Sequence, residues 1–73
     1  MSMTFGQTLY QRRMWLGLSA AATAQRLELQ PDTYRNWENG KHTPHALMQR
    51  GAISMLDDLA REHAHAVLTE LST

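Results

Sequence analysis

The sequence predicts an all-α fold of four to five helices, the last of which is long. β-Branched residues are scarce, and no stretch alternates between apolar and polar residues for long, which argues against strands. Alanine, leucine, methionine, glutamine and arginine are common, and these residues favour helices. Helix boundaries are expected at Gly17, Pro31, Gly40 and Pro44, since glycine is common just after a helix and proline in its first turn. The 73 residues are enough for one small helical domain.

The first helix is expected to begin directly after Thr4. Thr4 and Gln7 have the spacing of a capping box, in which each side chain satisfies a backbone N–H of the other. Phe5 and Leu9 then fall on one apolar face of the helix. Gly17 is expected to end it, because glycine readily adopts the left-handed conformation of a helix C-terminus.

Two short helices are expected next, joined by a tight turn. Ser19 is a good N-cap for a second helix over residues 20–27. Only three residues separate that helix from Pro31, which suits the first turn of a third helix over residues 31–39. Gly40 is expected to end the third helix. Two helices joined so closely cross at a steep angle.

The sequence after Gly40 predicts one long helix, with Thr43 as its N-cap and Pro44 as its first residue. No proline follows before Leu71, and Gly51 is the one point where the helix could divide in two. Residues 4–50 would then form a head and residues 51–73 a C-terminal helical segment. The segment has more apolar residues than a small head can cover, so we expect it to form a homodimer. The alternative is that the helix folds back on its own head. The residues expected at the dimer contact are Ile53, Leu56, Leu59, Ala60, Val67 and Leu71.

Charge is divided unevenly along the chain, although the formal net charge is zero. Residues 1–50 contain six lysines and arginines against three acidic residues, which gives +3. Residues 51–73 contain one arginine against four acidic residues, which gives −3. The sequence therefore predicts a basic functional head and an acidic tail.

Several classes of function find no support in the residues. The chain has no cysteine, and no nucleophile and base stand at a catalytic spacing, so we expect neither an enzyme nor a cofactor. His63 and His65 are two residues apart on a presumed helix and point to different faces, which argues against a metal site. No run approaches the roughly 18 apolar residues of a membrane span, and no signal peptide is evident. A cysteine-free chain of this kind is expected in the cytoplasm.

The order of these features is similar to that of a known family. The matching residues cover about residues 4–56: Gly6, Leu9 and Arg13 in the first helix, then Gly17, Leu18, Ser19, Ala24, Leu27 and Leu29, then the unbroken run Thr33-Tyr34-Arg35-Asn36-Trp37-Glu38-Asn39-Gly40-Lys41, and Pro44. In this pattern the chain resembles the Cro/C1-type helix-turn-helix family, also called the XRE family, of phage and bacterial DNA-binding proteins. The resemblance implies a lambda-repressor-like fold. Departures from the family pattern are Ala20 where many relatives have glutamine, Thr23 where they have leucine, and Glu28 where they often have glycine.

The resemblance also implies a structural ion pair. In the family, the glutamate of the W-E-x-G segment pairs with an arginine of the first helix, and the corresponding residues here are Glu38 and Arg13. A bidentate contact between them would fix how the third helix is presented. Trp37 and Tyr34 are expected in the core.

The family's third helix enters the major groove of DNA, so its exposed polar residues become candidate contacts. The candidates for bases are Gln30, Asp32, Thr33 and Asn36, and Arg35 could reach a base or a phosphate. Asparagine can read adenine, arginine reads guanine, aspartate accepts from cytosine, and the threonine methyl can meet a thymine methyl. The candidates for phosphates are Lys41, His42 and Thr43 after the third helix, and Arg12 or Ser19 before it.

Two functions fit these expectations. The first is a dimeric transcriptional regulator that binds an inverted-repeat operator in double-stranded DNA and represses its own operon, as in phage, anti-CRISPR-associated and antitoxin operons. The second is a module of the same fold that no longer binds DNA and uses its last helix to hold a partner protein such as a toxin. The basic head favours the first function, whereas the neutral overall charge and Ala20 favour the second.

Overall fold

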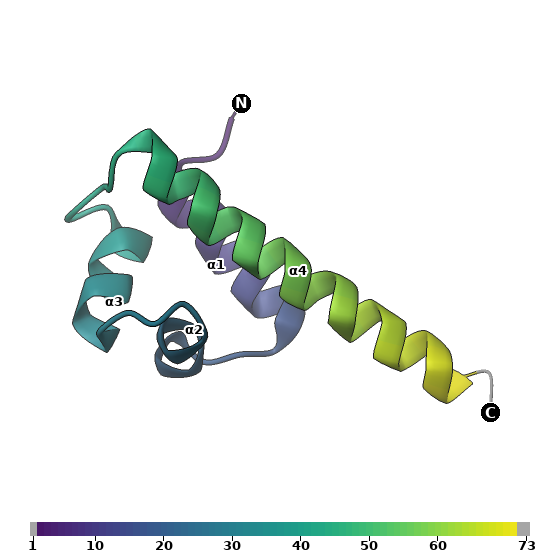
Figure 1. Cartoon of the computed structure of the whole chain (residues 1–73). Helices are drawn as coiled ribbons and strands as arrows, with labels where there is room; N and C mark the ends of the chain where they lie inside the picture. The colour runs from purple at the N-terminus through teal and green to yellow at the C-terminus, as the bar shows by residue number, and fades with distance from the viewer. Residues whose placement is uncertain (1, 72–73) are drawn as a thin grey trace.

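In the described part of the chain the first helix lies along the last one, and the two short helices between them pack on each other and on the first helix (Figure 1). The computed structural model describes residues 2–71. Its helices are α1 (Phe5–Leu16), α2 (Ala20–Arg26), α3 (Pro31–Asn39) and α4 (Ala46–Leu71), and no strand occurs among the described residues. The predicted all-α fold is confirmed. The C-terminal part of α4 projects beyond the other three helices.

The helix ends follow the capping signals of the sequence. The backbone N–H of Gln7 donates to Thr4 Oγ1 over 3.1 Å, and the N–H of Thr4 donates to Gln7 Oε1 over 2.9 Å, which completes the capping box of α1. Gly17 ends α1 with φ 71°. Ser19 Oγ accepts from the N–H of Ala22 over 3.1 Å and so caps α2. These local contacts satisfy backbone donors that a helix start leaves free.

The turn between α2 and α3 contains a residue in a conformation that usually favours glycine. Glu28 has φ 58°, in the left-handed region. A residue with a side chain pays about 1 kcal/mol or more for this conformation. The turn is held by the N–H of Leu29, which donates to the carbonyl of Ala24 over 2.8 Å. Glu28, which stands where the family that the chain resembles often has glycine, therefore adopts a backbone conformation that glycine reaches without strain.

The start of α4 differs from the prediction. Thr43 and Pro44 do not begin the helix, which starts at Ala46. Pro44 is buried, and its carbonyl oxygen accepts a hydrogen bond from Gln49 Nε2 over 2.7 Å, so this residue closes the loop onto the head instead of opening the helix. From Ala46 the helix runs through Gly51 without interruption. The described residues 2–71 consequently form four helices, and the division at Gly51 does not occur.

The core gathers residues from all four helices. Its buried apolar members are Leu9, Ala24, Leu27, Tyr34, Trp37, Ala52 and Leu56. Trp37 also lies against Phe5, with ring centroids 5.9 Å apart. Leu56 has no exposed surface, so its assignment to a dimer contact is wrong: it faces the head of its own chain. Leu59, one turn further on, is only partly buried and packs against the same core. The first half of α4 thus follows the alternative expectation and folds onto the head.

The backbones of α1 and α3 lie very close together at Gly6. A Cβ atom on this residue would lie 2.7 Å from the carbonyl oxygen of Trp37 and nearer still to that of Glu38. Real side-chain atoms do not come so close to backbone, so only glycine fits at this crossing. Gly6 therefore lets the start of α1 touch the end of α3.

Replacing Gly6 by alanine is expected to lower the free energy of unfolding by about 1–3 kcal/mol, because the added methyl group must push the two helices apart. Chemical denaturation followed by circular dichroism measures the change. The matched control is Gly51→Ala: a Cβ atom there meets nothing within 4 Å, and the substitution is expected to stabilise α4 by up to about 1 kcal/mol. Equal effects of the two substitutions would contradict the close approach at Gly6.

Candidate nucleic-acid interface

A bidentate ion pair joins α1 to α3. Arg13 Nε donates to Glu38 Oε2 over 2.8 Å, and Arg13 Nη2 donates to Glu38 Oε1 over 2.9 Å. The remaining nitrogen, Nη1, donates to the carbonyl oxygen of Leu18 over 3.1 Å. The guanidinium also lies over the ring of Tyr10, 5.1 Å from its centroid. The pair expected between Arg13 and Glu38 is therefore present, and it also holds the chain just after α1.

The environment of this pair keeps both partners charged. Burial is the largest influence on the pKa of Glu38 and raises it, but the hydrogen bonds from Arg13, the nearby Tyr34 hydroxyl and the positive charge of Arg13 together outweigh burial, so the pKa lies below its ordinary value. The hydrogen bond to Glu38 likewise raises the pKa of Arg13. Burial, together with the neighbouring Glu38 carboxylate, raises the pKa of Tyr34. Each partner is only 14% exposed, so the pair is shielded from screening by salt.

Helix α3 divides into an inner and an outer face. Tyr34 and Trp37 point into the core and are 0% and 4% exposed. Asp32 and Arg35 are exposed and Asn36 is half-buried, and their spacing places them on the side of the helix opposite the two aromatic rings. The inner face fixes α3 to the domain, and the outer face presents polar side chains to the surroundings.

An ion pair lies on the outer face itself. Arg35 Nη1 is 3.6 Å from Asp32 Oδ1, one turn of helix apart, and the two side chains are 59% and 93% exposed. Neither residue belongs to the hydrophobic core. Asp32 also stands in the first turn of α3, where a negative charge is favourable.

Three further candidates lie at the ends of this helix. Gln30 is the N-cap of α3, is exposed, and makes no capping hydrogen bond with its side chain, so its amide is available. Thr33 is half-buried on the flank of α3. Lys41 is exposed in the loop after α3, and its N–H donates to Asn39 Oδ1 over 3.0 Å. The N–H of His42 donates to the carbonyl oxygen of Asn36 over 3.2 Å, so the loop is pinned to the helix.

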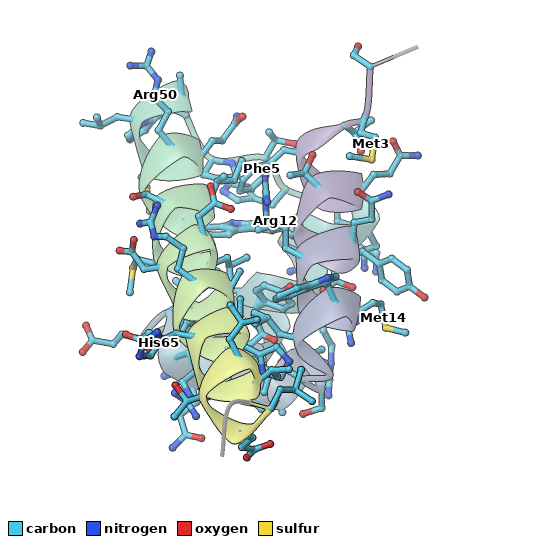
Figure 2. All side chains as sticks on the ribbon, turned by 90° about the vertical axis from the view of Figure 1, so that its right-hand side faces the viewer. Met3, Phe5, Arg12, Met14, Arg50 and His65 are labelled. Carbon is cyan, nitrogen blue, oxygen red and sulfur yellow. The ribbon has the colours of Figure 1, made fainter. Side chains whose placement is uncertain are left out.

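Two of the candidate DNA contacts lie away from the outer face of α3 and from the loop that follows it. Arg12 Nη1 is 2.7 Å from Asp57 Oδ1 of α4, and Figure 2 shows the side chain between α1 and α4. Arg12 therefore joins two helices of the scaffold, and its assignment as a phosphate contact is not supported, because a partner already holds its charge. Ser19 lies at the start of α2, where its side chain is engaged as the N-cap.

One outward residue was missed by the sequence analysis. Asn39 is exposed, and it follows Asp32 and Asn36 at a spacing that keeps all three on one stripe of α3. That spacing was visible in the sequence and could have identified it. Its carboxamide oxygen accepts from Lys41, so it also orients the basic loop.

Other kinds of site are not evident in the part of the chain that the structure describes. Within residues 2–71 there is no cluster of three or more histidine, aspartate or glutamate side chains that could hold a metal ion. None of the described helices is long and apolar enough to cross a lipid bilayer.

Helix α3 is joined to α2 by the four residues 27–30, is held by the core and by the Arg13–Glu38 ion pair, and is followed by a loop with Lys41. This is the arrangement of the helix-turn-helix class of DNA-binding domains. Residues 4–65 match a family model described as a helix-turn-helix domain, and the chain belongs to this family. The family is one of DNA-binding regulators. No curated protein and no solved structure matches the chain.

Replacing Arg13 by alanine is expected to lower the free energy of unfolding by about 3 kcal/mol at pH 7, because it leaves the Glu38 carboxylate largely buried without its partner. Thermal and chemical denaturation measure the loss. An unchanged melting temperature would contradict a structural role of the pair.

The pH dependence identifies the charge interaction as the cause. The pKa of Glu38 is lowered in the folded state, so its contribution to stability is fully present above the ordinary value of 4.5 and is lost as the pH falls through the folded-state pKa. The stability difference between the wild type and Arg13→Ala should therefore be full at pH 7 and shrink below about pH 4.5. A difference that stays constant down to pH 3 would point to lost packing instead.

Proposed function

We propose that this chain is a sequence-specific transcriptional regulator that binds operator DNA as a homodimer and represses its own operon. The observation that carries the proposal is the outer face of α3. Asp32, Arg35 and Asn39 on that face are exposed and Asn36 is half-buried, while Trp37 and Tyr34 on the inner face hold the helix in the core. A helix presented in this way fits the major groove of B-DNA, which is about 12 Å wide.

The distribution of charge supports the same function. Among the basic residues of the head, Arg35 and Lys41 lie on or directly after α3 and are exposed. Arg13, by contrast, is neutralised by Glu38, and Arg12 is paired with Asp57. Of the four head cations that form no ion pair with another helix, Arg35 and Lys41 therefore lie beside the outer face of α3, whereas Arg26 and Arg50 are exposed on α2 and α4. Such cations bind phosphates and make DNA affinity dependent on salt.

Replacing Arg35 and Asn36 together by alanine is expected to lower affinity for operator DNA by at least about tenfold, because each side chain that reads a base edge contributes roughly 1–3 kcal/mol. Fluorescence anisotropy with the promoter of the chain's own operon measures affinity, repeated over a series of salt concentrations. Wild-type affinity should fall steeply as salt rises.

The matched control is Arg61→Ala. Arg61 is an exposed arginine of α4 that pairs with Asp58, far along the chain from α3. Its loss is expected to leave DNA affinity within about twofold, and circular dichroism should show that all variants are folded. Full affinity in the Arg35 and Asn36 double variant would overturn the proposed function.

The proposed dimer contact is the apolar face on the second half of α4. Ala60, Ala64, Val67, Leu68 and Leu71 recur at helical spacing along it. Val67, Leu68 and Leu71 are 41%, 64% and 79% exposed in the single chain, and Trp15 at the end of α1 is 58% exposed. Exposed apolar side chains gathered along one face are typical of a protein contact. Ile53 is half-buried and lies on the same face nearer the start of the helix.

A homodimer of this kind would suit an inverted-repeat operator, because a two-fold symmetric protein matches a two-fold symmetric site. The half-sites would be centred about 34 Å apart, which is one turn of B-DNA, so that both copies of α3 meet the same side of the duplex. Occupancy of the operator would block transcription of the operon.

Replacing Leu68 and Leu71 together by glutamate is expected to convert the dimer to a monomer, because charged groups would have to be buried at the contact. Sedimentation velocity measures the mass of the assembly. Leu47→Glu is the control: Leu47 is 73% exposed at the opposite end of α4, so its substitution should leave the dimer intact. A monomeric wild type, or a dimer that survives the double substitution, would exclude this contact.

A second candidate is a protein-interaction module that holds a partner such as a toxin on the same face of α4. The exposed apolar residues of α4 and the net charge of zero favour it. The salt series separates the two candidates. A chain that shows no salt-dependent binding to DNA but forms a stable complex with the product of a neighbouring gene would support the interaction module.

A further inference from the structure

We propose that Asp32 and Arg35 act together to read a single C·G base pair in the operator, with Arg35 on the guanine and Asp32 on the cytosine. This inference rests on the proposed function and names the base pair that the outer face of α3 selects. The two side chains are already paired on that face, with 3.6 Å between Arg35 Nη1 and Asp32 Oδ1.

The exposure of the pair argues against a purely structural role. The side chains of Asp32 and Arg35 are 93% and 59% exposed. Exposed ion pairs one helical turn apart contribute only a few tenths of a kcal/mol to stability, since water screens them well. The pair can therefore be rearranged or opened against another surface at little cost.

The carboxylate of Asp32 restricts which bases can face it. A negative charge that is brought against DNA is repelled by the phosphates, so it is tolerated only where it meets a hydrogen-bond donor. On the major-groove edges of the bases, the only donors are the N4 amino group of cytosine and the N6 amino group of adenine. Asp32 therefore selects for one of these two bases.

The guanidinium of Arg35 determines whether the base that faces Asp32 is cytosine or adenine. Guanine offers two neighbouring acceptors, O6 and N7, which an arginine can engage with two hydrogen bonds. In a C·G pair the cytosine N4 group donates to guanine O6 over about 2.9 Å, as an ordinary N–H···O hydrogen bond does. Cytosine N4 and guanine O6 thus lie side by side at nearly the spacing of the Asp32 oxygen and the Arg35 nitrogen. An A·T pair offers a donor for Asp32 but no paired acceptors next to it for Arg35.

Each residue also orients the other. Arg35 is a long side chain with several rotatable bonds, and the Asp32 carboxylate restricts where its guanidinium can lie before DNA arrives. One Arg35 nitrogen can stay beside Asp32 while two N–H groups face guanine, since a guanidinium has five N–H donors. The pair as found is therefore close to the arrangement that the base pair requires.

The test begins with selection of binding sites from random duplex DNA, using the wild-type chain and the variants Arg35→Ala, Asp32→Ala and Lys41→Ala. The wild type is expected to enrich a site with a C·G pair at one position of each half-site. Both Arg35→Ala and Asp32→Ala should reduce the preference for C·G over A·T at that position, by about tenfold or more for Arg35→Ala, and leave the other positions unchanged. Lys41→Ala should weaken binding to all sequences alike.

A second measurement needs no protein variant and so does not depend on folding. In the enriched site, guanine of the critical pair is replaced by 7-deazaguanine, which lacks the N7 acceptor, or its cytosine by N4-methylcytosine, whose methyl group blocks the outer amino hydrogen. Each replacement should weaken wild-type binding about tenfold, and the same replacement at a neighbouring pair should have little effect. The 7-deazaguanine effect should vanish in Arg35→Ala, and the N4-methylcytosine effect should vanish in Asp32→Ala.

The outcomes separate this inference from the proposed function. If the wild type enriches no sequence, the proposed function fails and this inference fails with it. If the wild type enriches a site whose base preferences are unchanged in both Arg35→Ala and Asp32→Ala, the chain is a sequence-specific regulator but the joint reading of C·G is overturned. A uniform loss of affinity in Arg35→Ala would likewise overturn it and assign Arg35 to a phosphate.

Discussion

The salt bridge between Arg13 and Glu38 is the contact on which the orientation of α3 depends. Two hydrogen bonds join these side chains, and the third nitrogen of Arg13 donates to the carbonyl oxygen of Leu18. One guanidinium thus ties together α1, the connection to α2 and the end of α3. The close backbone approach at Gly6 acts at the same crossing, because it places α1 near enough to α3 for the pair to form. A domain of this size has only a small apolar core. The Arg13–Glu38 ion pair therefore fixes the orientation of α3 more tightly than apolar packing does alone.

Helix α3 has two functions on its two faces, and the division between them is sharp. Tyr34 and Trp37 belong entirely to the core, and Glu38 forms the ion pair with Arg13. Asp32 and Arg35 contribute to neither and interact with each other on the outside. Helix α4 is divided along its length instead of around its circumference. In its first half Ala52 and Leu56 are buried in the core, whereas in its second half Leu68 and Leu71 are exposed.

The sequence predicted those features that depend on neighbouring residues. The capping box of Thr4 and Gln7, the ends of α1 and α3 at Gly17 and Gly40, and the start of α3 at Pro31 all rest on local hydrogen bonds or local backbone preferences, so they could be read directly. The pairing of Arg13 with Glu38 was expected only through the family resemblance. Features set by tertiary packing were not predictable. The burial of Pro44 moved the start of α4, and the approach of α4 to α1 gave Arg12 a partner in Asp57, far away in the sequence. Periodicity identified an apolar face on α4 but could not tell that Leu56 is covered by its own chain.

The outer side chains of α3 take no part in holding the domain together, and this independence has an evolutionary consequence. Mutations at Asp32, Arg35 or Asn36 remove no residue of the hydrophobic core and leave the Arg13–Glu38 ion pair in place. A duplicated gene could therefore acquire a new DNA preference in a few steps while every intermediate remained folded. Sister regulators that share this scaffold could in this way coexist in one cell without occupying each other's promoters.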